Sequence, residues 1–181
     1  MPRKPQHAAG YVPAQIELVR ATCLYVATKL ADLMDELVIV GGLVPSLLIR
    51  PEALPAGTPG HVGTLDLDVG LTLALLDQGR YRSLTARLRD AGFSPDETEE
   101  GRPTRQRWRA PRTDKVTVDF LIPPSTESDE GGTIRSIEAD FAAIIAPGLA
   151  LAFQDRDRVT LEGRTDRMRL CSRLGGQTPT P

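Results

Sequence analysis

The spacing of hydrophobic positions predicts alternating helices and strands along the first two thirds of the chain. Apolar side chains recur at helical spacing over 14–36, and Pro13 suits the first turn of that helix. The run Leu37-Val-Ile-Val40 is short, β-branched and wholly apolar, which is typical of a buried strand that ends at a glycine turn. The same reasoning predicts a short helix at 43–49, a strand at 64–72, a helix at 80–91, and a hairpin of 105–109 with 115–122.

This order of elements predicts an α+β (mixed α/β) fold, with helices packed on a mixed sheet. A length of 181 residues favours one domain, which we expect at 13–163. Residues 1–12 hold two prolines and a glycine and are expected to be a flexible lead-in. An acidic loop is expected at 94–103. Residues 164–181 have few large apolar side chains and end in Gly-Gly-Gln-Thr-Pro-Thr-Pro, which predicts a disordered or loosely attached tail.

Composition and charge narrow the class of protein. Hydrophobic residues make up 40% of the chain and charged residues 25%, as in globular proteins. No apolar run approaches the ~20 residues of a membrane span, so no membrane partner is expected. The basic start Met1-Pro-Arg-Lys-Pro is not followed by an apolar signal core, and Cys23 and Cys171 are too few for a disulfide framework. The missing signal core and the small number of cysteines both favour a cytoplasmic location. The net charge of −2 argues against a polycationic nucleic-acid binder.

Aspartates stand at positions where strands could bring them together. Asp66 and Asp68 are two residues apart in a strand pattern, so their side chains share one face, while Leu65, Leu67 and Val69 face the core. Asp119 lies on the strand predicted at 115–122. If the two strands are neighbours, three carboxylates converge, and hard oxygen ligands in that arrangement suit Mg²⁺. The alternative is a solvated strand face, with Asp119 paired to a nearby arginine.

A glycine pair follows the first predicted strand. Gly41 and Gly42 lack Cβ atoms, so the backbone there can approach a phosphate closely, and Ser46, one turn later, could add a hydroxyl. The alternative is a glycine turn with a purely structural role. Phosphoryl-type transfer needs both a phosphate cradle and cations. A glycine turn, two aspartates on one strand and a third aspartate on another strand therefore indicate this chemistry far more specifically together than any one of them does alone.

Three segments together resemble the DNA polymerase β-like nucleotidyltransferase superfamily. They are Val38-Ile-Val-Gly-Gly42, Thr64-Leu-Asp-Leu-Asp68 and Val118-Asp-Phe-Leu121. The likeness is greatest to the minimal bacterial nucleotidyltransferases, which include the toxin component of abortive-infection toxin–antitoxin systems. It covers about residues 15–122.

The resemblance implies a fold, a reaction and partners. The fold is a palm-like mixed sheet, and the reaction is transfer of a nucleoside monophosphate from an NTP to a hydroxyl of an RNA, a small molecule or a protein. The cofactor is Mg²⁺, with Mn²⁺ as a substitute, and an antitoxin protein is an expected partner. The implied residues are Asp66, Asp68 and Asp119 as catalytic metal ligands, with Gly41, Gly42, Ser46 and Thr64 at the nucleotide.

The chain departs from the family pattern in two places. Relatives often carry an arginine shortly before the threonine of Thr-x-Asp-x-Asp, whereas His61-Val-Gly63 stands here, with His61 either a substitute donor or an exposed loop residue. Relatives also continue into a helical region with a Lys and a Lys-Asp pair, which Met168–Pro181 does not contain. The expectation is a truncated chain that leaves apolar sheet surface exposed and self-associates. The alternative function is then a catalytically inactive module that binds a nucleotide or a partner.

Arginines alternate along the strand predicted at 105–109. Arg105, Arg107 and Arg109 share one face, and Trp108 lies on the other, where it is expected to pack in the core. The arginines either steer a nucleotide or an RNA acceptor, or they form a solvated, charged edge strand.

Overall fold

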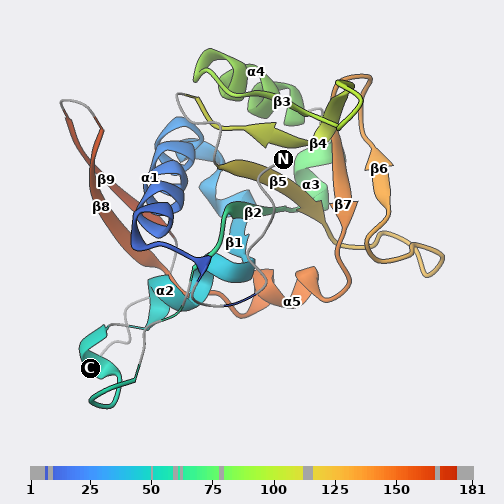
Figure 1. The fold of residues 1–181 in the computed structure, drawn as a ribbon. Helices are drawn as coiled ribbons and strands as arrows, with labels where there is room; N and C mark the ends of the chain where they lie inside the picture. The colour runs from blue at the N-terminus through green and yellow to red at the C-terminus, as the bar shows by residue number, and fades with distance from the viewer. Residues whose placement is uncertain are drawn as a thin grey trace.

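The computed structural model describes residues 7, 10–49, 51–58, 61, 63–77, 80–111, 116–165 and 168–174. Eight of the twelve residues of the lead-in expected at 1–12 lie outside these ranges. Figure 1 shows the arrangement of helices and strands. The elements are α1 (Pro13–Lys29), η2 (Ala31–Glu36), β1 (Leu37–Val40), η3 (Gly41–Leu43), α2 (Val44–Leu48), η4 (Pro51–Ala53), β2 (Asp66–Leu71), α3 (Leu73–Asp77), α4 (Tyr81–Asp90), β3 (Ser94–Glu97), β4 (Pro103–Arg109), β5 (Thr117–Ile122), β6 (Ile134–Ser136), β7 (Ala142–Ile145), α5 (Leu149–Gln154), β8 (Val159–Thr165) and β9 (Met168–Leu174).

Seven of the strands form one mixed sheet. Five strands are neighbours in the order β1-β2-β5-β4-β3. In addition, β7 pairs with the C-terminal end of β5, and β6 pairs with β7. The pairs β2–β5 and β5–β7 are parallel and the others are antiparallel. The predicted α+β fold is therefore confirmed, including the hairpin of β4 with β5. Within the described ranges, no helix is long and apolar enough to cross a membrane.

One face of the sheet is the hydrophobic core. Alternation along β2 and β5 sends Leu67, Val69 and Phe120 to this face, where all three are fully buried. Trp108 on β4 is fully buried there too, as its position opposite the arginines predicts. The helices α1 and α4 contribute to the same core, and the Tyr25 hydroxyl of α1 donates a hydrogen bond to the carbonyl of Ala91, the residue that follows α4, at 3.0 Å. The opposite face is consequently left for Asp66, Asp68 and Asp119.

Two local predictions differ from the structure. The helix expected over 14–36 ends at Lys29, and Ala31–Glu36 is a separate 3-10 helix that buries Leu33 against the core. The loop expected at 94–103 begins with the strand β3, which pairs with β4 at the sheet edge. Pro95 and two acidic residues disfavour a strand by propensity, but an edge strand tolerates proline, and pairing with β4 decides the conformation.

The C-terminal region contains a second, two-stranded sheet. The boundary expected at 163/164 falls inside β8, which pairs along its length with β9. Figure 1 shows this hairpin beside α1, which both of its strands contact, and Leu161 is buried in the core. The expected tail therefore includes described strand backbone at 164–165 and 168–174, whereas 166–167 and 175–181 lie outside the described residues.

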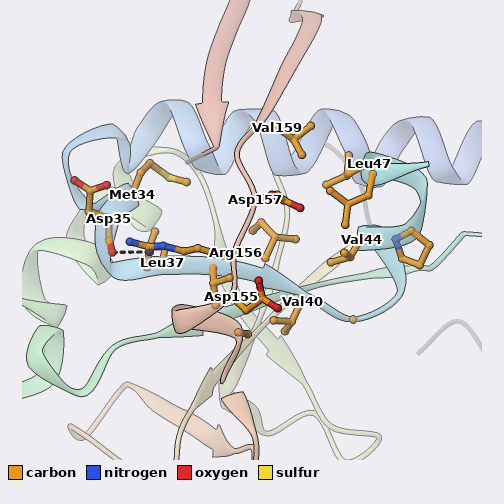
Figure 2. A pocket seen from close by; sticks show the side chains of 16 residues that line it. Met34, Asp35, Leu37, Val40, Val44, Leu47, Asp155, Arg156, Asp157 and Val159 are labelled. Atoms are coloured by element: carbon orange, nitrogen blue, oxygen red, sulfur yellow. Dashed lines mark hydrogen bonds between the residues drawn. The ribbon is translucent and has the colours of Figure 1, made fainter. Parts of the chain in front are cut away.

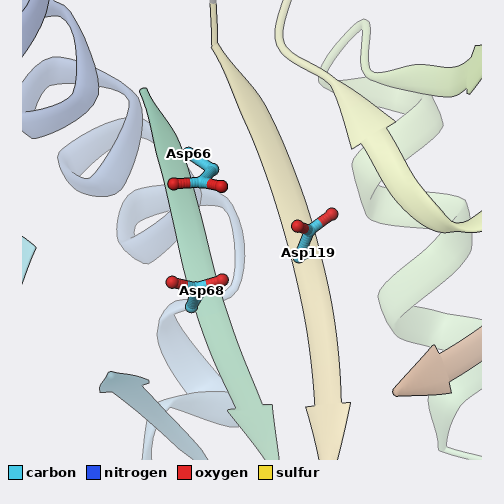
Figure 3. A group of neighbouring side chains, drawn as sticks. All are labelled: Asp66, Asp68 and Asp119. Atoms are coloured by element: carbon cyan, nitrogen blue, oxygen red, sulfur yellow. The ribbon is translucent and has the colours of Figure 1, made fainter. Parts of the chain in front are cut away.

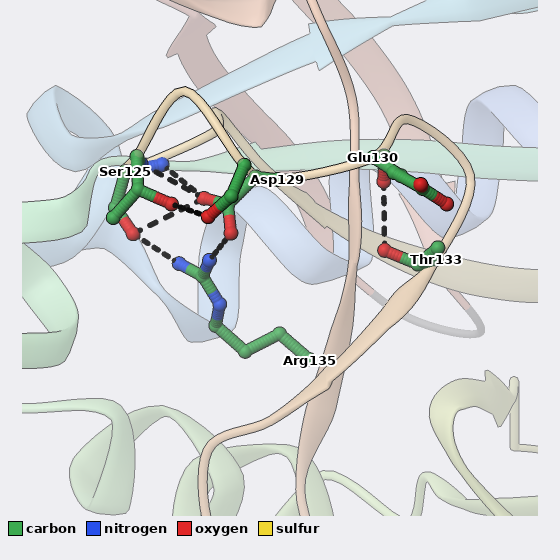
Figure 4. A network of polar contacts seen from close by, with 7 residues as sticks. Ser125, Asp129, Glu130, Thr133 and Arg135 are labelled. Carbon is green, nitrogen blue, oxygen red and sulfur yellow. Dashed lines mark hydrogen bonds and ion pairs between the residues drawn. The ribbon is translucent and has the colours of Figure 1, made fainter.

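A polar network orders the loop between β5 and β6 (Figure 4). The Asp129 carboxylate accepts hydrogen bonds from the backbone N–H groups of Ser125 at 2.6 Å and Thr126 at 3.0 Å, and it pairs with Arg135. Arg135 also donates to the Ser125 hydroxyl at 2.5 Å. The Arg135 guanidinium and the two backbone donors hold the pKa of Asp129 well below its ordinary value.

Because the pKa of Asp129 is depressed in the folded protein, its contribution to stability is present above the unfolded pKa of ~3.9 and is lost as the pH falls through the folded value. We expect Asp129→Asn to lower Tm by several degrees at pH 7 and by less at pH 2, because part of the contribution is lost between these pH values. Glu127→Gln, an exposed change in the same loop, should leave Tm unchanged at both pH values. An Asp129→Asn effect that is as large at pH 2 as at pH 7 would contradict the electrostatic explanation. Thermal melts from pH 7 to pH 2 measure it.

Candidate metal centre

Three carboxylates converge on two neighbouring parallel strands. The register of β2 with β5 pairs Asp68 directly with Asp119, and Asp66 lies two residues earlier on the same face. Each of the three residues offers a carboxylate oxygen that lies within 4.8 Å of the other two (Figure 3). The convergence expected from strand alternation is therefore confirmed.

The carboxylates are largely removed from water. Asp66 is 6% exposed and Asp119 3%, and Asp68 is half-buried. Buried carboxylates this close repel one another unless positive charge or hydrogen bonds compensate them. Part of that compensation comes from Thr64, whose hydroxyl donates to Oδ1 of Asp66 at 2.5 Å. This hydrogen bond from Thr64 also fixes the orientation of the Asp66 carboxylate.

Arg107 on β4 compensates the third carboxylate. The β4–β5 register places Arg107 opposite Asp119, and its Nε and Nη2 donate to the two carboxylate oxygens at 2.6 and 2.5 Å. This bidentate pair raises the pKa of Arg107 above its ordinary value. The pairing of Asp119 with a nearby arginine, anticipated as the alternative to a metal site, therefore occurs in the same structure as the convergence.

The other two arginines of β4 point to different partners. Arg109 donates to Oδ1 of the buried Asp96 on β3, at 2.7 and 3.2 Å. Arg105 is exposed and donates to the Ser136 hydroxyl at 2.9 Å. The three arginines share a strand face as predicted, but each one binds a different residue.

The donor set fits a divalent cation. Carboxylate oxygens are hard ligands, and an ion bound at ~2.1–2.6 Å from two oxygens spans up to roughly 4–5 Å between them. The separation of up to 4.8 Å within the Asp triad (Asp66, Asp68 and Asp119) is within that reach. The Asp triad could therefore hold a metal ion.

The glycine pair packs against the strand that carries the aspartates. Gly41 has φ +74°, and a Cβ atom there would overlap the carboxylate of Asp68. A Cβ atom on Gly42 would lie 2.9 Å from Cβ of Thr64, closer than real Cβ atoms approach. Both glycines are thus needed for the turn after β1 to lie flat against Thr64 and Asp68.

We expect Gly41→Ala to disturb Asp68 beyond the ordinary cost of a left-handed alanine. The positive φ alone costs about 1–2 kcal/mol, and the added methyl group also displaces the Asp68 carboxylate. Gly101→Ala is the matched control, because Gly101 has the same φ of +74° with nothing within 4 Å of the added atom. Urea unfolding should show a greater loss for Gly41→Ala than for Gly101→Ala, and only Gly41→Ala should weaken stabilisation by a divalent cation. Equal losses with an unchanged cation response would contradict the contact with Asp68.

Two further sequence candidates have local hydrogen bonds. The Ser46 hydroxyl donates to the Leu43 carbonyl at 2.7 Å, which leaves its oxygen lone pairs as acceptors rather than its proton as a donor. Nδ1 of His61 accepts from the backbone N–H of Gly63 at 3.0 Å, and His61 is exposed. The structure joins neither side chain to the Asp triad by a hydrogen bond among the residues it describes.

A cavity that no sequence motif predicts lies next to the glycine turn. Its volume is about 570 Å³, and it lies between β1, α2 and the strap, which is our name for residues 152–159 (Figure 2). Gly41 lines it and also packs against Asp68. The strap is more than a hundred residues from β1 along the chain, and no motif in the sequence links the two.

Comparison with protein-family models, with curated proteins and with solved structures finds no match to this chain. What the site can do therefore follows from its own residues. The described residues provide three clustered carboxylates, the Arg107 guanidinium, a close-packed glycine turn and a cavity that Gly41 also lines.

Proposed function

We propose that the protein is a Mg²⁺-dependent nucleotidyltransferase of the DNA polymerase β-like superfamily. It moves a nucleoside monophosphate from an NTP to a hydroxyl acceptor. The observation that carries the proposal is the meeting of Asp66, Asp68 and Asp119 on parallel strands, directly beside a glycine turn. These are the segments in which the sequence resembles the superfamily.

The Asp triad would hold the cation, with Mn²⁺ as a substitute for Mg²⁺. When bound, the ion supplies charge neutralisation for the triphosphate and lowers the pKa of the acceptor hydroxyl. Asp119 assists removal of the acceptor proton. The acceptor oxygen forms a bond to the α-phosphorus as the bond to the leaving pyrophosphate breaks.

The remaining residues orient these groups. Thr64 fixes the Asp66 carboxylate, and Arg107 fixes the Asp119 carboxylate, so both are preorganised before substrate binds. Gly41 and Gly42 present backbone without Cβ atoms next to the Asp triad, where the phosphates of the NTP approach, and the Ser46 oxygen lies in the helix that follows. The acceptor is an RNA, a small molecule or a protein side chain, and an antitoxin is the expected partner if the protein is a toxin.

One observation favours a second candidate function, a non-catalytic module that binds a nucleotide or a partner. Arg107 occupies both oxygens of Asp119, so part of the negative charge that would attract a cation is already compensated. In this alternative the Asp triad is a structural ion-pair cluster and not a metal centre.

Incubation with each labelled NTP, Mg²⁺ and total tRNA separates the two candidates. We expect label transfer by the wild-type protein and a loss of at least ~100-fold in Asp66→Asn, because the metal-dependent stabilisation of the transition state is worth several kcal/mol. Asp90→Asn, an exposed change at the end of α4, is the control and should transfer label normally. Binding of NTP without transfer to any acceptor class would support the non-catalytic module instead.

A further inference from the structure

Arg107 lies between two buried carboxylates, one on each neighbouring strand. On β5, Asp119 accepts hydrogen bonds from its Nε and Nη2 at 2.6 and 2.5 Å. On β3, Asp96 comes directly after Pro95, which pairs with Trp108 in the antiparallel β3–β4 register, and Arg107 comes directly before Trp108. Asp96 and Arg107 therefore lie side by side where this register shifts. Asp119 is 3% exposed and Asp96 5%.

Hydrogen bonds on β3 and β4 confirm that Asp96 adjoins Arg107. The Thr104 hydroxyl donates to the backbone carbonyl of Asp96 at 3.0 Å and to that of Arg107 at 2.7 Å. Arg109, which shares a strand face with Arg107, donates to Oδ1 of Asp96, so that carboxylate lies on the same face of the sheet. The hydrogen bonds to Asp119 are the largest cause of the raised pKa of Arg107, and the charge of Asp96 is among those that raise it further.

The contact with Arg107 occupies one member of the Asp triad. Both oxygens of Asp119 accept from the guanidinium, and a divalent cation held by the triad needs an oxygen of the same carboxylate. Arg107 and the cation also carry charge of the same sign and repel each other, so they compete for Asp119. On Asp96, by contrast, both contacts from Arg109 are to Oδ1, so Oδ2 can accept from a second guanidinium.

We propose that Arg107 exchanges its partner from Asp119 to Asp96 when the Asp triad binds a divalent cation, and that this exchange sets the affinity for the cation. The binding of a cation at the triad rests on the proposed function. In the cation-free protein, Arg107 holds the Asp119 carboxylate in place and compensates its charge. When Arg107 turns to Asp96, it keeps a buried carboxylate as its partner, and Asp119 presents its oxygens to the cation. Arg107 is thus a positioning residue with two alternative partners.

A Mn²⁺ titration followed by electron paramagnetic resonance measures the affinity for the cation without nucleotide or acceptor. Arg107→Ala should bind Mn²⁺ about tenfold more tightly than the wild-type protein, because coupling between two binding events typically changes an affinity by about 5–150-fold. Arg105→Ala also removes a positive charge from the same strand face, but Arg105 is exposed and contacts Ser136, so this control should bind Mn²⁺ as the wild-type protein does. Thermal melts in the presence of Mn²⁺ confirm that each variant is folded.

A second variant tests the alternative partner. Asp96→Asn removes the carboxylate to which Arg107 turns and should weaken Mn²⁺ binding about fivefold. Glu97→Gln is the matched control, because it removes an equal charge from the next residue of β3, which is exposed. In the Arg107→Ala background, Asp96→Asn should leave Mn²⁺ affinity unchanged, whereas a direct effect of the lost charge would weaken binding in both backgrounds. A crystal structure with Mn²⁺ should show the Arg107 guanidinium hydrogen-bonded to Asp96.

The outcomes separate this inference from the proposed function. Unchanged Mn²⁺ affinity in Arg107→Ala, an equal effect of Asp96→Asn in both backgrounds, or a Mn²⁺-bound structure in which Arg107 keeps both contacts to Asp119 would each overturn the exchange. So would the absence of Mn²⁺ binding in both the wild-type protein and Arg107→Ala. Label transfer that depends on Asp66 would support the nucleotidyltransferase even if the exchange is overturned. Coupled Mn²⁺ binding with no transfer from any NTP would support the exchange and overturn the nucleotidyltransferase.

Discussion

The double substitution Asp66→Asn/Asp68→Asn should stabilise the protein in EDTA and remove its response to Mg²⁺. Three carboxylates lie within 4.8 Å of one another, and like charges this close repel one another. Two unit charges 4 Å apart interact by about 4 kcal/mol at an effective dielectric constant of 20, and desolvation and hydrogen bonds reduce the net effect. We expect a gain of roughly 1–3 kcal/mol in the free energy of unfolding without metal.

Mg²⁺ should stabilise the wild-type protein and leave the stability of the double variant unchanged. A ligand at one hundred times its Kd stabilises the folded state by about 2.7 kcal/mol, so the wild-type protein should gain this much and the double variant nothing. Glu99→Gln/Glu100→Gln removes two charges from an exposed turn and should keep the wild-type response. Urea unfolding with and without Mg²⁺ measures both effects. An unchanged Mg²⁺ response in the Asp66→Asn/Asp68→Asn variant would place the cation elsewhere on the molecule.

The candidate site was predictable where local patterns determine the structure. Strict alternation over 64–72 determines the face on which Asp66 and Asp68 lie, because a strand has a side-chain period of two. The apolar run before Gly41 similarly identifies β1 and its end. That β2 and β5 are neighbours was a hypothesis, since strand adjacency depends on contacts between residues about 50 positions apart. The structure confirms it.

Features that depend on register or on distant segments were not predictable. Alternation puts Arg105, Arg107 and Arg109 on one face, but only the β4–β5 register assigns Arg107 to Asp119. Ser94–Glu97 is a strand because β4 pairs with it, although its residues have low strand propensity. The cavity beside β1 needs the strap, whose position follows from the path of the chain between α5 and β8.

Replacement of Arg107 by alanine should cause the greatest loss of stability among single changes at the site. Asp119 is 3% exposed, and Arg107→Ala would leave its charge buried next to Asp66 and Asp68. Removal of one partner of a buried ion pair typically costs 3–5 kcal/mol, and because the Arg107 side chain is 25% exposed we expect about 3 kcal/mol. Mg²⁺ should restore much of this loss, since a cation held by the Asp triad replaces the missing positive charge. Arg105→Ala, on the same strand face but exposed, should cost under ~0.5 kcal/mol.

A double-mutant cycle with Asp119→Asn separates the ion pair from lost packing of the arginine side chain. Asp119→Asn removes the charge that Arg107 compensates, so Arg107→Ala should cost much less in the Asp119→Asn background than in the wild-type protein. Arg107→Lys retains the charge but not the bidentate geometry and should fall between wild type and Arg107→Ala. If Arg107→Ala is no less stable than Arg105→Ala, or if the cycle shows no coupling, the ion pair does not stabilise the Asp triad. The negative charge of the Asp triad would then have to be compensated by Thr64 and by the cation.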